Sequence, residues 1–518
     1  MAERTQPIRA LPGAIAACFV LAVVLGAFAA VVSGADAGRG LGSADWAALR
    51  FTVLQAALSA GLSVALAIPV ARALSRRRFR GRALLIAFLG APFLLPVIVA
   101  ILGMLAVFGR NGWISLVLGQ FGLPPIQIYG LHGVVLAHVF FNLPLAVRLI
   151  LQAWQAIPAE RFRLAAQLGC GSREIWFLLE WPALRRAIPG ALAVVFAICL
   201  TSFAVALTLG GGPKATTLEL AIYQAFRFDF DLGRAALLGC IQIGVAGLAG
   251  LVAMATLSDV GFGGGLDRAM DRWDGVGGLA KVGDAVAILI TAAFLFLPLA
   301  AIVVAGLPGL GGLPVTVWKA AGVSLIVAFA STCILLALAL PMAATIARAR
   351  RGWLETVGLM GLATSPLVIG TGLFLVINPV ADPFLLALPV TAVVNAIMAL
   401  PFALRIFVPA ARNVLQVYGR LALSLELTGR TFWRVVLLRR LRPQIGFAAG
   451  LTAALSMGDL GVIAMFADPE RATLPLQVYR LMGAYRMESA QAAALLLLML
   501  AFGLFWLCDR GGRSGDSV

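Results

Sequence analysis

The stretch Leu143-Pro144-Leu145-Ala146-Val147-Arg148 returns as Leu400-Pro401-Phe402-Ala403-Leu404-Arg405, at an offset of 257 (position 401 against position 144). At the same offset Trp176 matches Trp433, and Leu184-Arg185 matches Leu441-Arg442. Each copy lies in an arginine-rich polar segment between long apolar runs. Because the chain repeats a polar loop rather than an apolar segment, we expect the repeated feature to be a docking surface.

The composition around these loops is that of a membrane protein. Hydrophobic residues make up 61% of the 518 residues and charged residues only 12%. Backbone polar groups in lipid must be satisfied within a segment, so helices of roughly 20 apolar residues are the expected spanning form. Alternation typical of an outer-membrane barrel is absent from the sequence. The fold class is therefore predicted to be an all-α polytopic membrane protein.

Hydropathy predicts twelve spans, six on each side of a glycine-rich segment. They are expected at about 12–33, 50–73, 84–108, 130–153, 187–209, 234–257, 285–306, 318–346, 354–378, 384–409, 444–467 and 489–508. The first run is expected to be an uncleaved helix, although Ala35-Asp36-Ala37 resembles a signal-peptide cleavage site.

Positive charge sets the predicted orientation. With the N-terminus inside, the inner segments hold 30 of the 40 Lys and Arg residues, as the positive-inside rule requires. Both termini are therefore predicted to be cytoplasmic. The net charge of +17 is spread over short loops, which argues against a nucleic-acid partner and makes membrane lipid the expected contact.

The domain organisation follows from the same pattern. Residues 1–257 form the first predicted repeat, 258–283 a cytoplasmic glycine-rich linker and 284–518 the second repeat. An even number of spans in each half makes the repeats parallel, related by a pseudo-twofold axis along the membrane normal. A solute path is then expected between the halves.

The first repeated loop, 157–184, predicts a short surface helix at 159–168 that Gly169 ends. The loop resembles the EAA loop of ABC-importer permeases, the coupling helix that docks on the ATPase subunit. Ala165, Ala166 and Gly169 match that pattern, whereas Leu164 stands where the family usually has Glu. In the second loop Ala422 is kept, Leu423 replaces the second Ala, and Glu426 occupies the Gly position. The resemblance assigns to the coupling loops Arg163, Leu164, Ala165, Ala166, Gly169, Ala422, Leu423 and Glu426.

A more specific resemblance covers nearly the whole chain. The strings at 209–225 (LGGGPKATTLELAIYQA), 456–466 (SMGDLGVIAMF) and 473–476 (TLPL) are similar to those of thiamine ABC-transporter permeases of the bacterial inner membrane. The resemblance implies a periplasmic thiamine-binding protein and two cytosolic ATPase subunits as partners. The chain has no G-x-x-x-x-G-K-[ST] loop, so it is predicted to be a transport subunit without its own ATPase site.

Few residues in the spans are candidates for substrate contact. Asp459 lies inside an apolar run, where a carboxylate usually faces a cavity or a partner. Phe203 and Phe466 could cover a cationic substrate, and position 202 is the counterpart of Asp459 in the first half. The slightly favoured interpretation makes Asp459 a helix-end or inter-helix tether, with the substrate held chiefly by the binding protein.

Two other functions fit part of the sequence. Ferric-iron importer permeases share the fused two-repeat layout, and an ion-coupled secondary transporter could have parallel repeats. The second alternative predicts several titratable residues in the spans, where Asp459 is nearly alone. His132, His138 and Asn142 border the fourth span without metal-ligand partners nearby in sequence, so they are expected to have packing or interfacial roles. No cofactor, metal site or disulfide framework is predicted.

Overall fold

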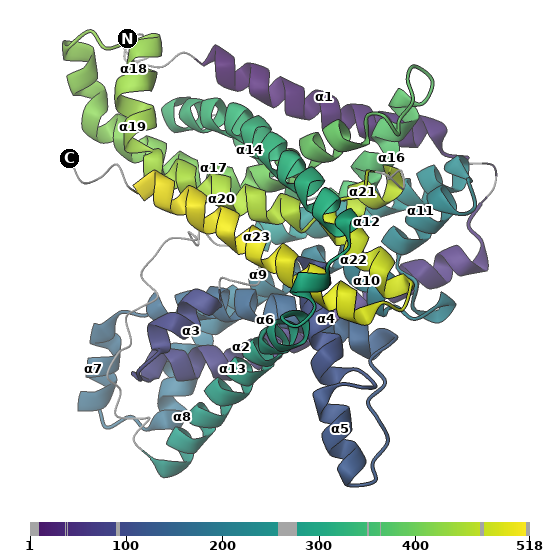
Figure 1. Ribbon diagram of the computed structural model, residues 1–518. Helices are drawn as coiled ribbons and strands as arrows, with labels where there is room; N and C mark the ends of the chain where they lie inside the picture. The colour runs from purple at the N-terminus through teal and green to yellow at the C-terminus, as the bar shows by residue number, and fades with distance from the viewer. Residues whose placement is uncertain are drawn as a thin grey trace.

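The chain is an assembly of helices (Figure 1). The computed structural model describes residues 10–36, 38, 40–89, 94–256, 277–349, 352–362, 364–466 and 471–513, and no strand occurs among them. The first half contains α1 (Leu11–Gly34), α2 (Ser43–Arg76), α3 (Arg82–Phe88), α4 (Val97–Phe108), α5 (Trp113–Gln120), α6 (Leu131–Gln155), α7 (Ala159–Gln167), α8 (Ser172–Ile175), α9 (Trp181–Leu200), α10 (Ala204–Leu209), α11 (Leu218–Arg227) and α12 (Leu232–Thr256). The second contains α13 (Gly278–Gly306), α14 (Val315–Ala349), α15 (Gly352–Leu359), α16 (Pro366–Ile377), α17 (Ala387–Ser424), α18 (Gly429–Phe432), α19 (Leu438–Arg440), α20 (Arg442–Met457), α21 (Gly461–Phe466), α22 (Leu474–Gly483) and α23 (Met487–Arg513).

The two halves run through the same succession of elements. The packed pair α2–α6 corresponds to α14–α17, and α9–α12 corresponds to α20–α23. The π-helical turns at Trp176–Glu180 and Trp433–Leu437 lie at the offset of 257 found in the sequence. The start of α11 is held by a hydrogen bond from Leu218 N to Thr52 Oγ1 (2.8 Å), and the start of α22 by one from Leu474 N to Ser324 Oγ (2.8 Å). Sequence repetition is thus accompanied by repetition of local contacts.

The all-α membrane fold is confirmed, with a small correction to the spans. Among the described residues, eleven helical stretches are long and apolar enough to cross a membrane, and α16 is a shorter apolar helix of 12 residues. The predicted spans 84–108 and 354–378 are each interrupted, giving α3 and α4 in one half and α15 and α16 in the other. Pro96 and Pro366 stand at the starts of α4 and α16, because proline suits a helix start and disfavours helix in the residue before it.

Each first helix packs on the opposite half. Helix α1 lies against α14 and α16, whereas α13 lies against α2 and α4. Glycine permits both approaches: a Cβ on Gly372 would collide with the Ala27 carbonyl, and one on Gly103 with the Pro298 carbonyl. The first predicted span is therefore an integral helix of the fold, packed against the second half.

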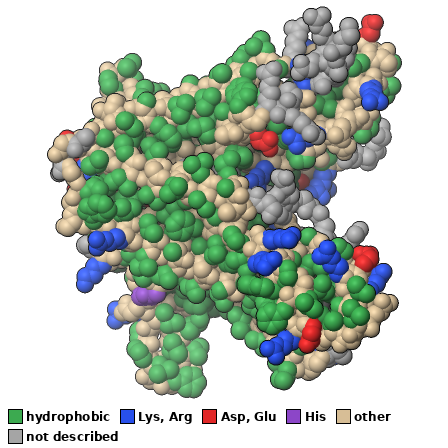
Figure 2. Space-filling model, turned by 180° about the vertical axis from the view of Figure 1, so that it is seen from behind, with side chains coloured by type: hydrophobic (Ala, Val, Ile, Leu, Met, Phe, Trp, Pro, Cys, Tyr) green, Lys and Arg blue, Asp and Glu red, His purple; other side chains and the backbone are tan. Residues whose placement is uncertain are grey.

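The repeated loops lie at one end of the molecule. Helix α1 begins and α23 ends at the end that carries α7–α8 and α18–α19 (Figure 1). Seen from behind, the surface is mostly apolar, and Lys and Arg side chains gather over two lobes beside a notch (Figure 2). The predicted linker 258–283 lies outside the described residues as far as residue 276, and α13 begins at Gly278.

Candidate functional site

A cavity of about 400 Å³ lies between the two halves. It is lined from the first half by the start of α4, the middle of α6 and the end of α9, and from the second by α16, α17 and the end of α20. His138 and Asn395 line it at corresponding positions, as do Ser202 and Asp459, each pair separated by 257 residues. The cavity therefore lies where the two repeats face each other.

Two interruptions between helices lie beside the cavity. Helix α9 ends at Leu200 and α10 begins at Ala204, whereas α20 ends at Met457 and α21 begins at Gly461. Irregular backbone within a membrane is tolerated where it is buried in protein or lines a cavity. Asp459 belongs to the second break, and one of its oxygens, Oδ1, accepts a hydrogen bond from Gly461 N (3.1 Å). One oxygen of the carboxylate therefore has the capping role that the structural interpretation assigned to it.

The second half supplies a connected polar wall. The Asn395 amide donates to Ser456 Oγ (3.0 Å), and Ser456 Oγ is also 3.0 Å from Ser331 Oγ. Asn395 interacts with the Asp459 carboxylate as well. Asp459 is the one charged side chain among the described residues that line the cavity. The negative charge of this wall is therefore concentrated at a single carboxylate.

The first half supplies a second polar group. Ser59 Oγ lies 3.3 Å from His138 Nδ1, across α2 and α6. The Asn142 amide donates to the His138 carbonyl (2.9 Å) and to Cys199 Sγ (3.3 Å). His138 is only 3% exposed and lines the cavity, a position that the sequence argument, which expected a packing or interfacial role, did not anticipate. Its counterpart Asn395, a second polar residue in an apolar run, was the signal that could have identified it.

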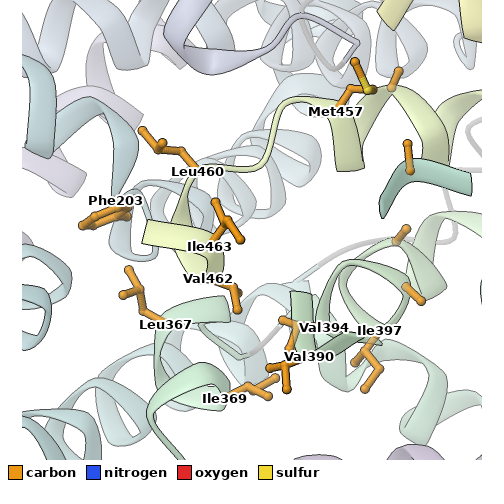
Figure 3. Packing of buried hydrophobic residues seen from close by; sticks show 14 of the residues in the cluster. Phe203, Leu367, Ile369, Val390, Val394, Ile397, Met457, Leu460, Val462 and Ile463 are labelled. Carbon is orange, nitrogen blue, oxygen red and sulfur yellow. The ribbon is translucent and has the colours of Figure 1, made fainter. Parts of the chain in front are cut away.

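The two predicted aromatic residues have different environments. Phe203 lines the cavity beside Leu367 and Leu460 (Figure 3) and packs edge-on against Tyr223, with ring centroids 5.1 Å apart. Phe466 is fully buried and packs against Phe374, with ring centroids 5.7 Å apart. The structure therefore brings Phe203 and Asp459 together at the cavity and places Phe466 in the packed core.

The first repeated loop contains the short helix predicted for it. Helix α7 exposes Arg163, Leu164 and Ala166, and Leu164 is 57% exposed. Ala165 is only 8% exposed and packs toward the body of the protein. Gly169 follows the helix with φ of +68°, a backbone conformation that glycine adopts at little cost.

The second loop reaches the same geometry from a different sequence. Ala422 is 3% exposed, Leu423 is half-buried and Glu426 is exposed, with φ of +56°. The turn after the first helix is closed by Cys170 N donating to the Ala165 carbonyl, and the second by Leu427 N donating to the Ala422 carbonyl. Both loops therefore end in the same left-handed turn, although Gly169 is replaced by Glu426.

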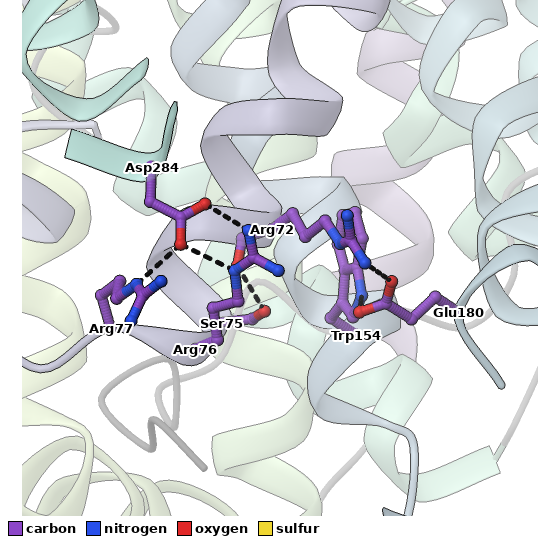
Figure 4. Close-up of polar contacts among 7 residues, drawn as sticks. All are labelled: Arg72, Ser75, Arg76, Arg77, Trp154, Glu180 and Asp284. Carbon is purple, nitrogen blue, oxygen red and sulfur yellow. Dashed lines mark hydrogen bonds and ion pairs between the residues drawn. The ribbon is translucent and has the colours of Figure 1, made fainter. Parts of the chain in front are cut away.

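The base of the first loop holds a buried ion pair. Arg72 Nη2 lies 2.8 Å from Glu180 Oε2, and Trp154 Nε1 donates to Glu180 Oε1 (3.1 Å). Glu180 is fully buried, and the Arg72 guanidinium lies 4.9 Å from the centre of the Trp176 ring. Figure 4 shows Arg72 and Trp154 converging on Glu180. These contacts join α2 and α6 to the segment that follows the loop.

A second ion pair ties the two halves together at the same end. Arg76 donates to both oxygens of Asp284 (2.7 and 2.5 Å), and Arg77 Nε donates to Oδ2 (2.6 Å). Asp284 lies in α13, the first helix of the second half, and both arginines lie at the end of α2. Sequence reasoning counted these arginines as orientation signals and did not anticipate this contact.

Comparison with known proteins covers the whole chain. It is 39% identical to the thiamine transport system permease protein of Escherichia coli, over 98% of both chains. It is 37% identical to the protein of that name from Brucella abortus, over 98% of this chain and 96% of the relative. The chain belongs to the family of thiamine transport system permease proteins. The Haemophilus influenzae member is 34% identical over 88% of this chain. No protein-family model matches the sequence.

Family membership and fold together establish a coarse function. The chain is a multi-pass membrane permease of the kind that serves transport systems. The ferric-iron alternative is not favoured, since the relatives that match along the whole chain are named for thiamine.

Proposed function

We propose that the chain is the transmembrane subunit of an ABC importer that carries thiamine from a periplasmic binding protein to the cytoplasm, with the phosphate esters of thiamine as further candidate substrates. Full-length similarity to thiamine permeases is the observation that carries this proposal. The cavity supports it, because its one described charged lining residue, Asp459, is an anion and thiamine has a fixed positive charge.

Residues 1–257 and 284–518 would act as two repeats that move relative to each other. Helix α17 runs without interruption from Asn395 at the cavity to Ala422 at the second loop, a distance of about 40 Å at the helical rise per residue. A displacement of the loop would therefore reach the cavity wall through one continuous helix, which also contains Pro401 and Pro409. In the first half, α6 and α7 make the same connection through the turn before Ala159.

Two cytosolic ATPase subunits would dock on the two lobes and hydrolyse ATP. The exposed residues Arg163, Leu164, Ala166 and Gly169 present the first docking surface, and Leu423 and Glu426 belong to the second. Buried Ala165 and Ala422 anchor these surfaces to the body of the protein. Leu164→Arg with Leu421→Arg places a positive charge where the family usually has Glu, and should release the ATPase while the chain still reaches the membrane. Val380→Arg, at an 86% exposed site outside both coupling loops, is the control.

The transport experiment is uptake of radiolabelled thiamine in a strain that lacks the chain, with and without complementation. Restored thiamine uptake is expected. Restoration of ferric-iron uptake in place of thiamine uptake would contradict the proposal.

The proposed orientation places both termini and both loops in the cytoplasm. Reporter fusions at Arg77 and Arg412 should then report a cytoplasmic location, and one at Pro213 a periplasmic location. The opposite pattern would overturn the orientation and the assignment of the docking loops.

A further inference from the structure

Two buried polar atoms at the cavity have no hydrogen-bond partner in the described part of the chain. They are His138 Nε2 in the first half and Asp459 Oδ2 in the second. Most buried polar side-chain atoms in proteins are hydrogen-bonded. Two atoms that lack partners at the same cavity therefore indicate a place where a ligand or water binds. The two atoms come from opposite sides of the interface between the halves.

The protein holds each group so that one atom remains available. Ser59 lies at Nδ1 of His138, which leaves Nε2 as the free ring nitrogen. Gly461 N donates to Oδ1 of Asp459 and Asn395 lies beside the carboxylate, while Oδ2 accepts no hydrogen bond from the described residues. Each side chain is thus held by a contact with a residue of its own half of the chain, as side chains in binding sites commonly are.

The space between these groups suits a small aromatic molecule. A volume of about 400 Å³ falls in the range of small-molecule pockets. Phe141, Phe203 and Phe402 line it, and aromatic rings attract a flat cation through their faces. The cavity therefore combines an anionic group, a neutral polar group and aromatic walls.

We propose that this cavity is a binding site for one flat heteroaromatic cation, with the cationic ring at Asp459 and a hydrogen-bonding ring edge at His138. The inference rests on the proposed function, since thiamine has a thiazolium ring joined to an aminopyrimidine. It goes further, because it makes the permease itself a second point of selection after the periplasmic protein. The bound molecule would bridge the two halves, so its departure is coupled to their separation.

The test measures equilibrium binding to the purified complex of the chain with its ATPase subunits, without the periplasmic protein. Three probes separate the two ends of the site. Thiamine has both groups, oxythiamine replaces the pyrimidine amino group by a carbonyl, and tetrahydrothiamine lacks the fixed cation. The wild-type complex should bind thiamine saturably with one molecule per chain.

Each variant should lose discrimination at one end only. His138→Phe should weaken thiamine binding about fivefold and bind thiamine and oxythiamine equally, because one neutral hydrogen bond is lost. Asp459→Asn should weaken it about tenfold and bind thiamine and tetrahydrothiamine equally, because a charged contact is lost. Ser63→Ala, which removes another buried unpaired oxygen that does not line the cavity, is the matched control and should change neither preference.

The outcomes separate this inference from the proposed function. Absence of saturable binding in a complex that still supports thiamine uptake would overturn the site and leave the function intact. Loss of uptake for thiamine in the complemented strain would overturn both. Equal losses for all three probes in both variants would also overturn the site, because they would indicate a general structural effect.

Discussion

The two repeated loops have the same backbone outline and are built on different side chains. In the first, Pro158 separates α6 from α7, whereas its counterpart Leu415 lets α17 continue as one helix to Ser424. Proline removes a backbone donor and disfavours helix in the preceding residue, which accounts for the difference. The turn that follows is nevertheless the same in both halves, so the shape of the turn does not depend on how the chain enters the loop.

The bases of the loops differ more. Arg72, Trp154 and Glu180 form a buried polar cluster under the first loop. The corresponding region of the second half contains Ala344, Ala411 and Leu437, which belong to one buried apolar cluster. Trp154 matches Ala411 and Glu180 matches Leu437 at the offset of 257, and Arg72 matches Ala344 when Pro69 is aligned with Pro341. The same architecture is thus stabilised by an ion pair in one half and by apolar packing in the other.

The largest expected effect comes from breaking the ion pair. Glu180→Leu copies the second half at one position only and leaves Arg72 and the Trp154 N–H without their partner. Removing one member of a buried pair typically costs about 3 kcal/mol or more. A large fall in the unfolding temperature of the purified complex is expected, measured against Leu437→Met as a conservative change at the matching site.

The compensating variant sharpens this comparison. Arg72→Ala combined with Glu180→Leu reproduces the second-half pair Ala344 and Leu437, and should recover much of the lost stability, since a buried pair replaced by apolar groups is often nearly neutral. A double variant no more stable than Glu180→Leu would show that the two bases are not interchangeable.

The next effect concerns the continuous helix. Leu415→Pro should interrupt α17 where Pro158 interrupts the first half, at a cost of about 3 kcal/mol in a helix interior. Uptake should fall further than the loss of stability alone predicts, because the continuous helical connection between the second loop and Asn395 is lost. The reciprocal Pro158→Leu should be milder. Equal uptake in Leu415→Pro and wild type, in chains of equal abundance, would argue against transmission along α17.

Much of this fold follows from the sequence because it depends on local patterns. The offset of 257 located both loops, and Gly169 marked the end of α7. The packing of each first helix on the opposite half was not predictable, since the close approaches at Gly103 and Gly372 bring together residues far apart in sequence. Asp459 and Phe203 were identifiable as candidates from position alone. The place of His138 at the cavity was not evident from that residue alone, because the cavity forms only where the two halves meet and only the polar counterpart Asn395 hinted at it.

A third difference between the halves predicts a pH dependence. Glu219 in α11 is fully buried and accepts a hydrogen bond from Gln242 (2.9 Å), whereas its counterpart in α22 is Pro475. Burial raises the pKa of Glu219 from 4.5 to about 7, with hydrogen bonds from Ser365 and Gln242 opposing the rise. The folded state therefore favours the protonated acid, so the contribution of Glu219 to stability is greatest below pH 4.5 and is lost as the pH rises through 7.

Between pH 5.5 and 7.5 the titration of Glu219 lowers the free energy of unfolding by about 2 kcal/mol. The wild-type complex should unfold at a higher temperature at pH 5.5, after subtraction of the pH trend seen in Glu219→Gln, which keeps the shape without the titration. An identical trend in the variant would assign the dependence to other groups.

The smallest expected change in stability comes from substitutions in the two left-handed turns. One substitution should be destabilising and the other stabilising. Gly169 has φ of +68°, and no atom lies within 4 Å of an added Cβ, so Gly169→Ala tests backbone strain alone. It should cost about 1 kcal/mol, because a side chain disfavours this conformation. Glu426 already bears that strain at φ of +56°, so Glu426→Gly should change stability by less than about 1 kcal/mol and in the stabilising direction. Unfolding temperatures of the two variants, measured in the same complex, should therefore move apart. If both fall equally, the matching turns seen at the two loops do not carry matching strain, and the likeness of the loops is limited to their outline.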